Sequence, residues 1–204
     1  MQRPATVNGL NSSDVISGIQ KHIRRGEEQL AMQAAAELLF STAKGNATWL
    51  VNRLVVIAHE DIGIANPQAV MFVNTTVPHI RELLKEAKID RAGLLIANCI
   101  LMMCRGPKTR LGDHFQCAAG KPVKLGIRPY QIPDYVYDKH TSKGRKAGCD
   151  LQHFRDESAK LAAGEFAGLE DPYIDAAYKM WEYMEKHGSD RPTATDAQGS
   201  LFEE

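Results

Sequence analysis

The sequence predicts an all-α protein, an array of short helices with a long irregular loop and a disordered C-terminal tail. Apolar residues recur at spacings of three and four along most of the chain up to residue 118, as on buried helix faces. Prolines then interrupt the chain, and residues 188–204 are almost entirely polar. With 44% apolar and 25% charged residues, the composition excludes a largely disordered, collagen-like or coiled-coil protein.

The first helix is expected to follow a flexible N-terminus, residues 1–11, and to be capped by Ser12 or Ser13. Its apolar residues have helical spacing, and it ends in basic residues and a glycine at 24–26, which is typical of a helix C-terminus. The next helices are expected at 27–43 and 47–59, from Pro67, from Pro78 to 88, from Asp90 to 103, and from Pro107 to 118.

Three prolines make the segment 120–149 a long irregular loop, and loops of this length inside a compact domain are often functional. Helices are expected to resume at 150–163 and at 172–186. We therefore expect one helical domain over residues 12–187, followed by the disordered tail over 188–204.

Charge and cysteine content narrow the class of protein. The 25 Lys and Arg residues balance 25 Asp and Glu, which argues against a non-specific polyanion binder but allows a local basic patch. The four cysteines form no C-x-x-C pair and are expected to be reduced and buried. No signal-peptide pattern is seen, and the longest apolar-rich stretch, 92–104, is too short to span a bilayer. We expect a cytoplasmic protein without a membrane partner.

One motif, N-R-L-V-V-I-A-H-E-D-I-G-I-A-N-P, runs from Asn52 to Pro67. It resembles the signature of the C-terminal region of the RarA/MgsA family, replication-associated AAA+ ATPases related to clamp loaders. Residues 16–39 and 104–109 resemble flanking parts of that region, so the resemblance covers roughly residues 14–118. The positions that carry it are Arg53, Glu60, Asp61, Gly63, Pro67, Pro107 and Lys108.

The resemblance implies a clamp-loader-type helical collar domain, which in the family assembles four subunits and supports action at replication forks. These 204 residues contain no G-x-x-x-x-G-K-[ST] loop, so we expect no ATP hydrolysis and no cofactor. His59 and Asn66 stand where the family has serine and aspartate. The sequence thus resembles the collar without its motor, a free-standing form associated with phages or mobile elements.

The motif also has a structural interpretation from its own residues. Glu60 and Asp61 follow an apolar helix and could pair with Arg53 or cap the helix that begins at Pro67. Gly63 permits a positive φ at the turn. We expect the two carboxylates to anchor a buried turn, which is favoured over a catalytic pair.

The tail contains Gln198-Gly199-Ser200-Leu201-Phe202, which closely matches the Q-x-[SD]-L-F peptide that bacterial polymerases and repair proteins use to dock on the sliding clamp. Leu201 and Phe202 would fill an apolar pocket, and the Gln198 amide would fix the orientation through hydrogen bonds. The alternative is that Leu201 and Phe202 fold back onto the helical domain.

Positive charge gathers in the long loop, in a run that we call the basic segment: Lys139, His140, Lys143, Arg145 and Lys146. Such residues can contact successive phosphates, and Tyr130, Tyr135 and Tyr137 could stack on bases, so DNA is a candidate partner. The alternative is a solvated charged loop whose tyrosines pack on the domain.

A second interpretation is a small phosphate- or nucleic-acid-processing enzyme, with Asp138 and His140 as an acid–base pair if the backbone turns there. Two groups have spacings compatible with metal ligation, Asp113 with His114 and Cys117, and Cys149 with His153. Ordinary packing explains these groups better, so no metal is expected.

We therefore expect a non-enzymatic accessory factor of DNA replication or repair, or a phage factor directed at host replication proteins. It is expected to form homo-oligomers, tetramers among them, through its apolar helices and to dock on the bacterial sliding clamp through its tail.

Overall fold

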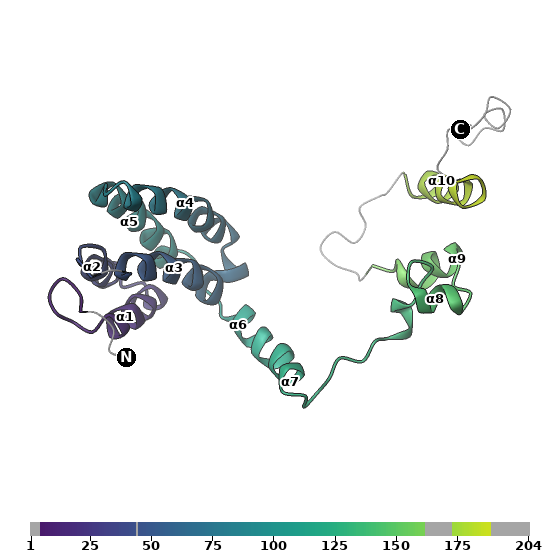
Figure 1. Ribbon diagram of the computed structural model, residues 1–204, viewed down its shortest axis with the longest axis horizontal. Helices are drawn as coiled ribbons and strands as arrows, with labels where there is room; N and C mark the ends of the chain where they lie inside the picture. The colour runs from purple at the N-terminus through teal and green to yellow at the C-terminus, as the bar shows by residue number, and fades with distance from the viewer. Residues whose placement is uncertain (1–4, 44, 162–172, 189–204) are drawn as a thin grey trace, which may run out of the picture. The chain divides into compact units, whose positions relative to one another are not determined.

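The computed structural model describes residues 5–43, 45–161 and 173–188 (Figure 1). All regular secondary structure in this part of the chain is helical, with no strand, which confirms the all-α prediction. The chain divides into two compact units, residues 1–129 and 130–204. The division lies inside the predicted long loop, within the range that was expected to form one domain.

Unit 1 is built on helices that pack around one apolar core. They are α1 (Ser12–Arg25), α2 (Glu28–Leu39), α3 (Asn46–Ile57), α4 (Pro67–Lys85) and α5 (Ile89–Arg105). Each helix contributes fully buried side chains, among them Ile19, Leu38, Leu54, Ile80 and Ile96. Apolar burial of this kind is the dominant stabilising term for such a bundle, at about 25 cal/mol per Å² removed from water.

Helix α1 is capped by Asn11, not by Ser12 or Ser13. The Asn11 side chain accepts a hydrogen bond from the Ser13 backbone N–H at 2.8 Å. Ser12 is fully buried, and its hydroxyl donates to Asn46 Oδ1 at the start of α3. The serine is therefore used for a contact between helices, which a local capping pattern does not reveal. Gly26 ends α1 with φ +76°, as expected for a glycine after a helix.

Between α3 and α4 the chain widens into a π-helical turn, η1 (Ala58–Ile62), followed by a 3-10 turn, η2 (Gly63–Ala65). Turns of this kind are often found at functional sites. Here they form residues 58–65 of the sequence motif that runs from Asn52 to Pro67.

The prediction that Pro78 begins a helix was wrong, because Pro78 lies inside α4. Val73, Val77 and Ile80 stay buried on one face across the proline. Their burial continues the helix despite the backbone hydrogen bond that an internal proline removes, a loss of about 3 kcal/mol in an isolated helix. The prediction for Pro107 was also wrong, since the next helix, α6 (Leu111–Phe115), begins four residues later.

The predicted long loop is irregular for most of its length but contains short helices. The elements from α6 onward are η3 (Gln116–Gly120) and α7 (Lys121–Lys124) in unit 1, then η4 (Asp134–Val136), α8 (Ser142–Lys146), α9 (Leu151–His153), η5 (Phe154–Ser158) and α10 (Ile174–His187) in unit 2. Among its described residues, unit 2 buries far fewer apolar side chains than unit 1, with Leu151 and Tyr178 as the most buried ones.

All four thiols are free, but they differ in exposure. Cys99 and Cys104 are buried on α5, and burial raises the pKa of each thiol to about 11. Cys117 is exposed on η3 and Cys149 is half-buried, so the expectation that all four are buried was wrong. No helix in the described ranges is long and apolar enough to cross a membrane.

Candidate functional site

The second half of the motif, residues 58–67, is organised around the carboxylate of Asp61, which is 1% exposed on the π turn η1. Gln20 Nε2 donates to Asp61 Oδ2 at 2.8 Å, and Arg24 Nε donates to Oδ1 at 2.7 Å. Both donors come from the last turns of α1. The hydrogen bond to Asp61 raises the pKa of the Arg24 guanidinium, whose charge is thereby stabilised in the folded state.

A second arginine reaches the same carboxylate from the segment that follows α5. Arg110 Nε is buried without a hydrogen-bond partner and lies 3.8 Å from Asp61 Oδ1. The Arg110 guanidinium also pairs with Asp113 and lies 3.5 Å from Glu60 Oε1. The backbone N–H of Thr109 donates to the Asp61 carbonyl at 2.9 Å. Asp61 therefore joins α1, η1 and the start of α6.

The partners of the two carboxylates, and the cap of α4, differ from those expected from the sequence. Arg53 donates to Gln20 Oε1 at 3.2 Å rather than pairing with either carboxylate. Helix α4 is capped by Asn66, whose side chain accepts from the Ala69 N–H, with Pro67 in the first turn. Gly63 adopts φ +49°, a conformation that favours glycine.

The end of α5 is closed by Lys108, whose ammonium donates to the carbonyls of Cys104 and Gly106 at 2.6 and 3.0 Å. A cation is favourable at this end of a helix because of its dipole. A Cβ at Gly106 would lie 2.3 Å from Asn66 Nδ2. The motif at 52–67 and the segment 104–109, which both carry the family resemblance, therefore meet at this point. Every signature position except Pro107 thus has a side-chain contact or a backbone role in unit 1, and Pro107 lies between Gly106 and Lys108.

In unit 2, the basic segment turns around the side chain of Asp138. The Asp138 carboxylate accepts a hydrogen bond from the His140 backbone N–H at 2.9 Å and lies 2.8 Å from His140 Nδ1. The backbone therefore turns here, as the acid–base interpretation required. Thr141 caps the short helix α8 by accepting from the Gly144 N–H. Gly144 has no room for a side chain, since a Cβ there would lie 2.0 Å from the Asp138 carbonyl oxygen.

The hydrogen bond from His140 lowers the pKa of the Asp138 carboxyl. Because the folded-state pKa lies below the unfolded one, this contact stabilises the turn above the usual Asp pKa, about 3.9. That contribution is lost as the pH falls through the lowered pKa.

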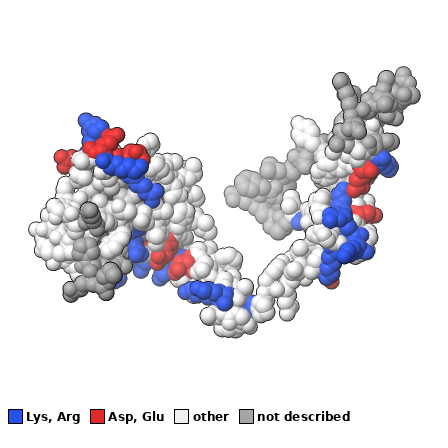
Figure 2. Space-filling model, in the orientation of Figure 1, with Lys and Arg blue, Asp and Glu red and all other residues white. Residues whose placement is uncertain are grey.

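The cations of the basic segment are largely engaged within unit 2. Lys139 pairs with Glu185 of α10, and the Lys143 ammonium lies 3.8 Å from the Tyr137 ring centroid. Arg145 Nη1 donates to the carbonyls of Lys139 and His140. Figure 2 shows basic side chains gathered with acidic ones on this part of unit 2. Lys146 is exposed, and Tyr130 and Tyr135 are 68% and 58% exposed.

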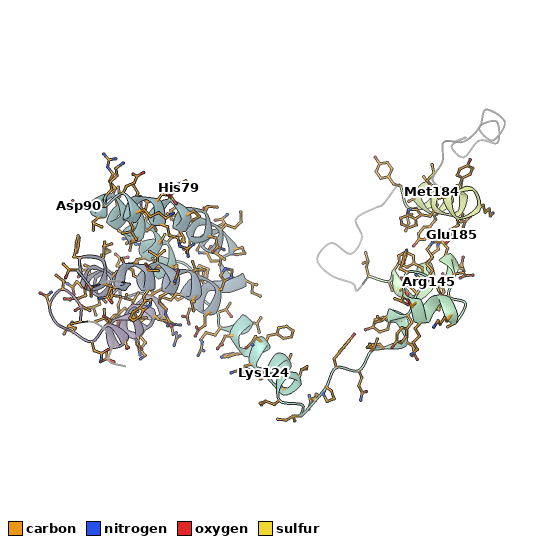
Figure 3. The ribbon with its side chains drawn as sticks, in the orientation of Figure 1. His79, Asp90, Lys124, Arg145, Met184 and Glu185 are labelled. Atoms are coloured by element: carbon orange, nitrogen blue, oxygen red, sulfur yellow. The ribbon has the colours of Figure 1, made fainter. Side chains whose placement is uncertain are left out.

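A groove of about 420 Å³ lies beside the basic segment, between α10 and the residues of α9 and η5. Its apolar wall is formed by Leu151, Phe154, Trp181 and Met184. His140 meets the Phe154 ring edge-on at 5.2 Å between centroids. Figure 3 shows Glu185 on the side of α10 that faces Arg145 of α8. This groove was not predicted from the sequence, where the apolar face of the α10 segment was its only signal.

The structure does not support the candidate metal ligands, and it does not describe the candidate peptide of the tail. No group of three or more His, Cys, Asp or Glu side chains in the described ranges is placed to hold a metal ion. Asp113 pairs with Arg110, and Cys117 is exposed. The peptide predicted to bind the sliding clamp, Gln198, Ser200, Leu201 and Phe202, lies outside the described residues.

The chain matches a known protein family over most of its length. The family model described as MgsA AAA+ ATPase C terminal matches residues 33–188. The match extends through the basic segment, beyond the resemblance expected for residues 14–118, and begins later.

Among curated proteins, Replication-associated recombination protein A of Bacillus subtilis is 29% identical over 143 residues, 69% of this chain and 32% of that protein. The protein of the same name from Haemophilus influenzae is 27% identical over 154 residues, 74% of this chain and 33% of that protein. An uncharacterized AAA domain-containing protein of Mycobacterium tuberculosis is 23% identical over 168 residues, 81% of this chain and 35% of that protein. The chain spans about a third of the length of these relatives.

Replacement of the buried carboxylate tests the role of the motif. Asp61→Ala is expected to lower the free energy of unfolding by about 2–3 kcal/mol, since it removes two charge-assisted hydrogen bonds. The loss stays below the roughly 3–5 kcal/mol of a fully buried pair, because Arg24 is 36% exposed and can turn to water. Urea unfolding measures the effect.

The matched control is Glu60→Ala, on the same turn, whose carboxylate lies 3.6 Å from Arg24 and is 28% exposed. It is expected to cost less than about 1 kcal/mol, as for other partly exposed ion pairs. Equal losses for the two variants would contradict the special role of Asp61.

Proposed function

The chain belongs to the MgsA AAA+ ATPase C-terminal family, and from this premise we propose that it is a non-enzymatic accessory factor of DNA replication or repair. The proposed factor acts in the bacterial cytoplasm, in support of replication or as a phage factor that diverts it. Two of the relatives carry the name Replication-associated recombination protein, which supports this assignment. The structural use of Asp61 supports it as well, because a carboxylate engaged by Gln20 and Arg24 is not free for proton transfer.

The proposed partner is the bacterial sliding clamp, bound through Gln198-Gly199-Ser200-Leu201-Phe202. The observation that carries this proposal is the order of the residues, a glutamine followed at the third and fourth positions by leucine and phenylalanine. Two adjacent apolar side chains can fill a pocket on a rigid partner, while the amide fixes the peptide by hydrogen bonds.

The clamp proposal predicts that Leu201→Ala/Phe202→Ala lowers recovery of the host sliding clamp at least about tenfold in a pull-down with the full chain. Removal of two buried apolar anchors from a small interface costs more than the roughly 1.4 kcal/mol that this factor represents. Thr193→Ala, in the same part of the sequence but outside the motif, serves as the control and should recover the clamp normally. Undiminished recovery with the double variant would refute the proposal.

We also propose self-association through the α4–α5 face of unit 1. A groove of about 600 Å³ runs there along Phe72, Asn98, Leu101 and Met102. Leu94, four residues before Asn98 on the same helical stripe, is 64% exposed. An apolar surface of this kind is typical of contacts between subunits.

The self-association proposal predicts that Leu94→Glu/Met102→Glu lowers the mass of the full chain measured by sedimentation, because two charges would be buried in the contact. The control is Leu30→Glu, a leucine of α2 that is 47% exposed. A chain that is monomeric before any substitution would contradict the proposal, as would a double variant that keeps its mass.

A second candidate function, contact with nucleic acid or its processing, is centred on the basic segment and the Asp138–His140 pair. The hydrogen bond between Asp138 and His140 Nδ1 favours it, since it orients the ring and leaves Nε2 available for a proton. The internal contacts of Lys139, Lys143 and Arg145 disfavour it, because they must be broken or shared for phosphate binding.

This second candidate predicts that Lys143→Glu/Lys146→Glu weakens binding of single-stranded DNA and flattens its salt dependence, by about 0.7 in the slope for each phosphate that is no longer neutralised. Lys124→Glu, in unit 1, is the control (Figure 3). Fluorescence anisotropy at several salt concentrations measures both quantities. Identical binding by the double variant would rule out this contact. Processing of the DNA by the parent chain that is lost in His140→Ala would favour the enzyme interpretation.

A further inference from the structure

The groove in unit 2 has a mainly apolar lining, which suits apolar side chains. Its volume of about 420 Å³ falls in the range of ligand pockets, about 300–1,000 Å³. Trp181 lines the groove, is 42% exposed as a residue, and meets Phe154 and Tyr178 edge-on, at 6.3 and 5.1 Å between ring centroids. These contacts hold Trp181 in place although much of its surface is uncovered, so an apolar ligand would bury it at little cost in ordering.

The charges around the groove are unequal. Where the groove is lined by Lys139 and Glu185, the two side chains neutralise each other. Beyond that pair, the adjoining helix α8 carries Lys143, Arg145 and Lys146 and no acidic residue. Arg145 is tied to the edge of the groove, because its Nη1 donates to the carbonyls of two lining residues, Lys139 and His140. An occupant with apolar side chains next to acidic ones would complement this arrangement.

We infer that the groove binds Leu201 and Phe202 of the same chain, with Glu203 and Glu204 beside the cations of α8. Residues 189–204 contain no other large apolar side chain, and the two glutamates follow directly. A nucleobase could stack on the rings of Phe154 and Trp181, but it is a poorer occupant because it lacks the tether that keeps the tail peptide at high effective concentration.

The connection is long enough for this contact. Met184 and Glu185 line the groove, and α10 ends two residues later. Twelve residues separate Gly188 from Leu201, and a chain of that length can bridge up to about 40 Å. Tethering of this kind provides an effective concentration on the order of millimolar, so even a weak intrinsic affinity fills the groove.

This inference goes beyond the proposed function and does not require it. If the groove and the sliding clamp both bind this peptide, they compete for the same two side chains. The apparent affinity for the clamp is then the intrinsic affinity multiplied by the fraction of chains whose peptide is free.

The test uses the full chain with Trp49→Phe, which leaves Trp181 as the one tryptophan of the sequence. In this background, Leu201→Ser/Phe202→Ser should shift the Trp181 emission to longer wavelength and remove its protection from acrylamide. Thr193→Ser is the matched control and should change neither. Equal quenching with and without Leu201 and Phe202 would overturn the inference.

Three further arms identify the occupant. A synthetic peptide of residues 197–204, added to the double variant at about millimolar concentration, should restore the protection. Protection by an oligothymidylate but not by the peptide would overturn the inference in favour of a nucleobase. Protection in the parent chain that weakens on dilution would overturn it in favour of the peptide of a second copy.

Failure of this inference can be told from failure of clamp docking. Met184→Lys places a charge in the groove and leaves the tail peptide intact, so it should expose Trp181 and raise clamp recovery. If Trp181 becomes exposed while no clamp is recovered from any variant, the groove inference stands and clamp docking fails. If Met184→Lys changes neither the quenching nor the recovery, the groove inference fails.

Discussion

In unit 1, the junction of α1, the π turn η1 and α6 depends on the contact between one buried carboxylate, Asp61, and the guanidinium group of Arg24. The two residues lie 37 positions apart, and their hydrogen bond fastens the π turn after α3 to the end of α1. A carboxylate without these donors would be too costly to bury. The same turn holds the Thr109 N–H through its backbone carbonyl, so α6 starts from it as well. The motif therefore works as a junction between segments, which explains why its acidic residues need not act on a substrate.

The helices of unit 1 could be predicted because each has a strong apolar period, but their contacts could not. Glu60 and Asp61 were expected to anchor the turn by pairing with Arg53 or by capping the helix at Pro67, whereas the observed donors to the Asp61 carboxylate come from α1. Pro78 was taken as a helix start because the rule for proline is local, while the burial of Val77 and Ile80 belongs to the tertiary structure. Local signals thus predicted the elements, and the partners required the packing.

Unit 2 shows the opposite balance. Its elements are short, and several lie where prolines predicted an irregular loop. The basic segment was predicted as a charged surface, but Asp138, Thr141 and Gly144 fold it into a compact turn that engages most of its cations. The groove beside it could not be foreseen, because its wall combines residues from separate segments. A pattern of charges in a sequence does not state which charges are already paired.

The central claim is that the Asp61 carboxylate holds α1, the π turn and α6 together. Amide hydrogen exchange of Thr109 in the Asp61→Asn variant tests it most directly, with the amides of α5 as an internal reference. We expect protection of Thr109 to fall much further than that of the buried α5 residues Ile96 and Ile100, because the turn that accepts its hydrogen bond is released. Equal changes at Thr109 and in α5, or no change at Thr109, would contradict the claim.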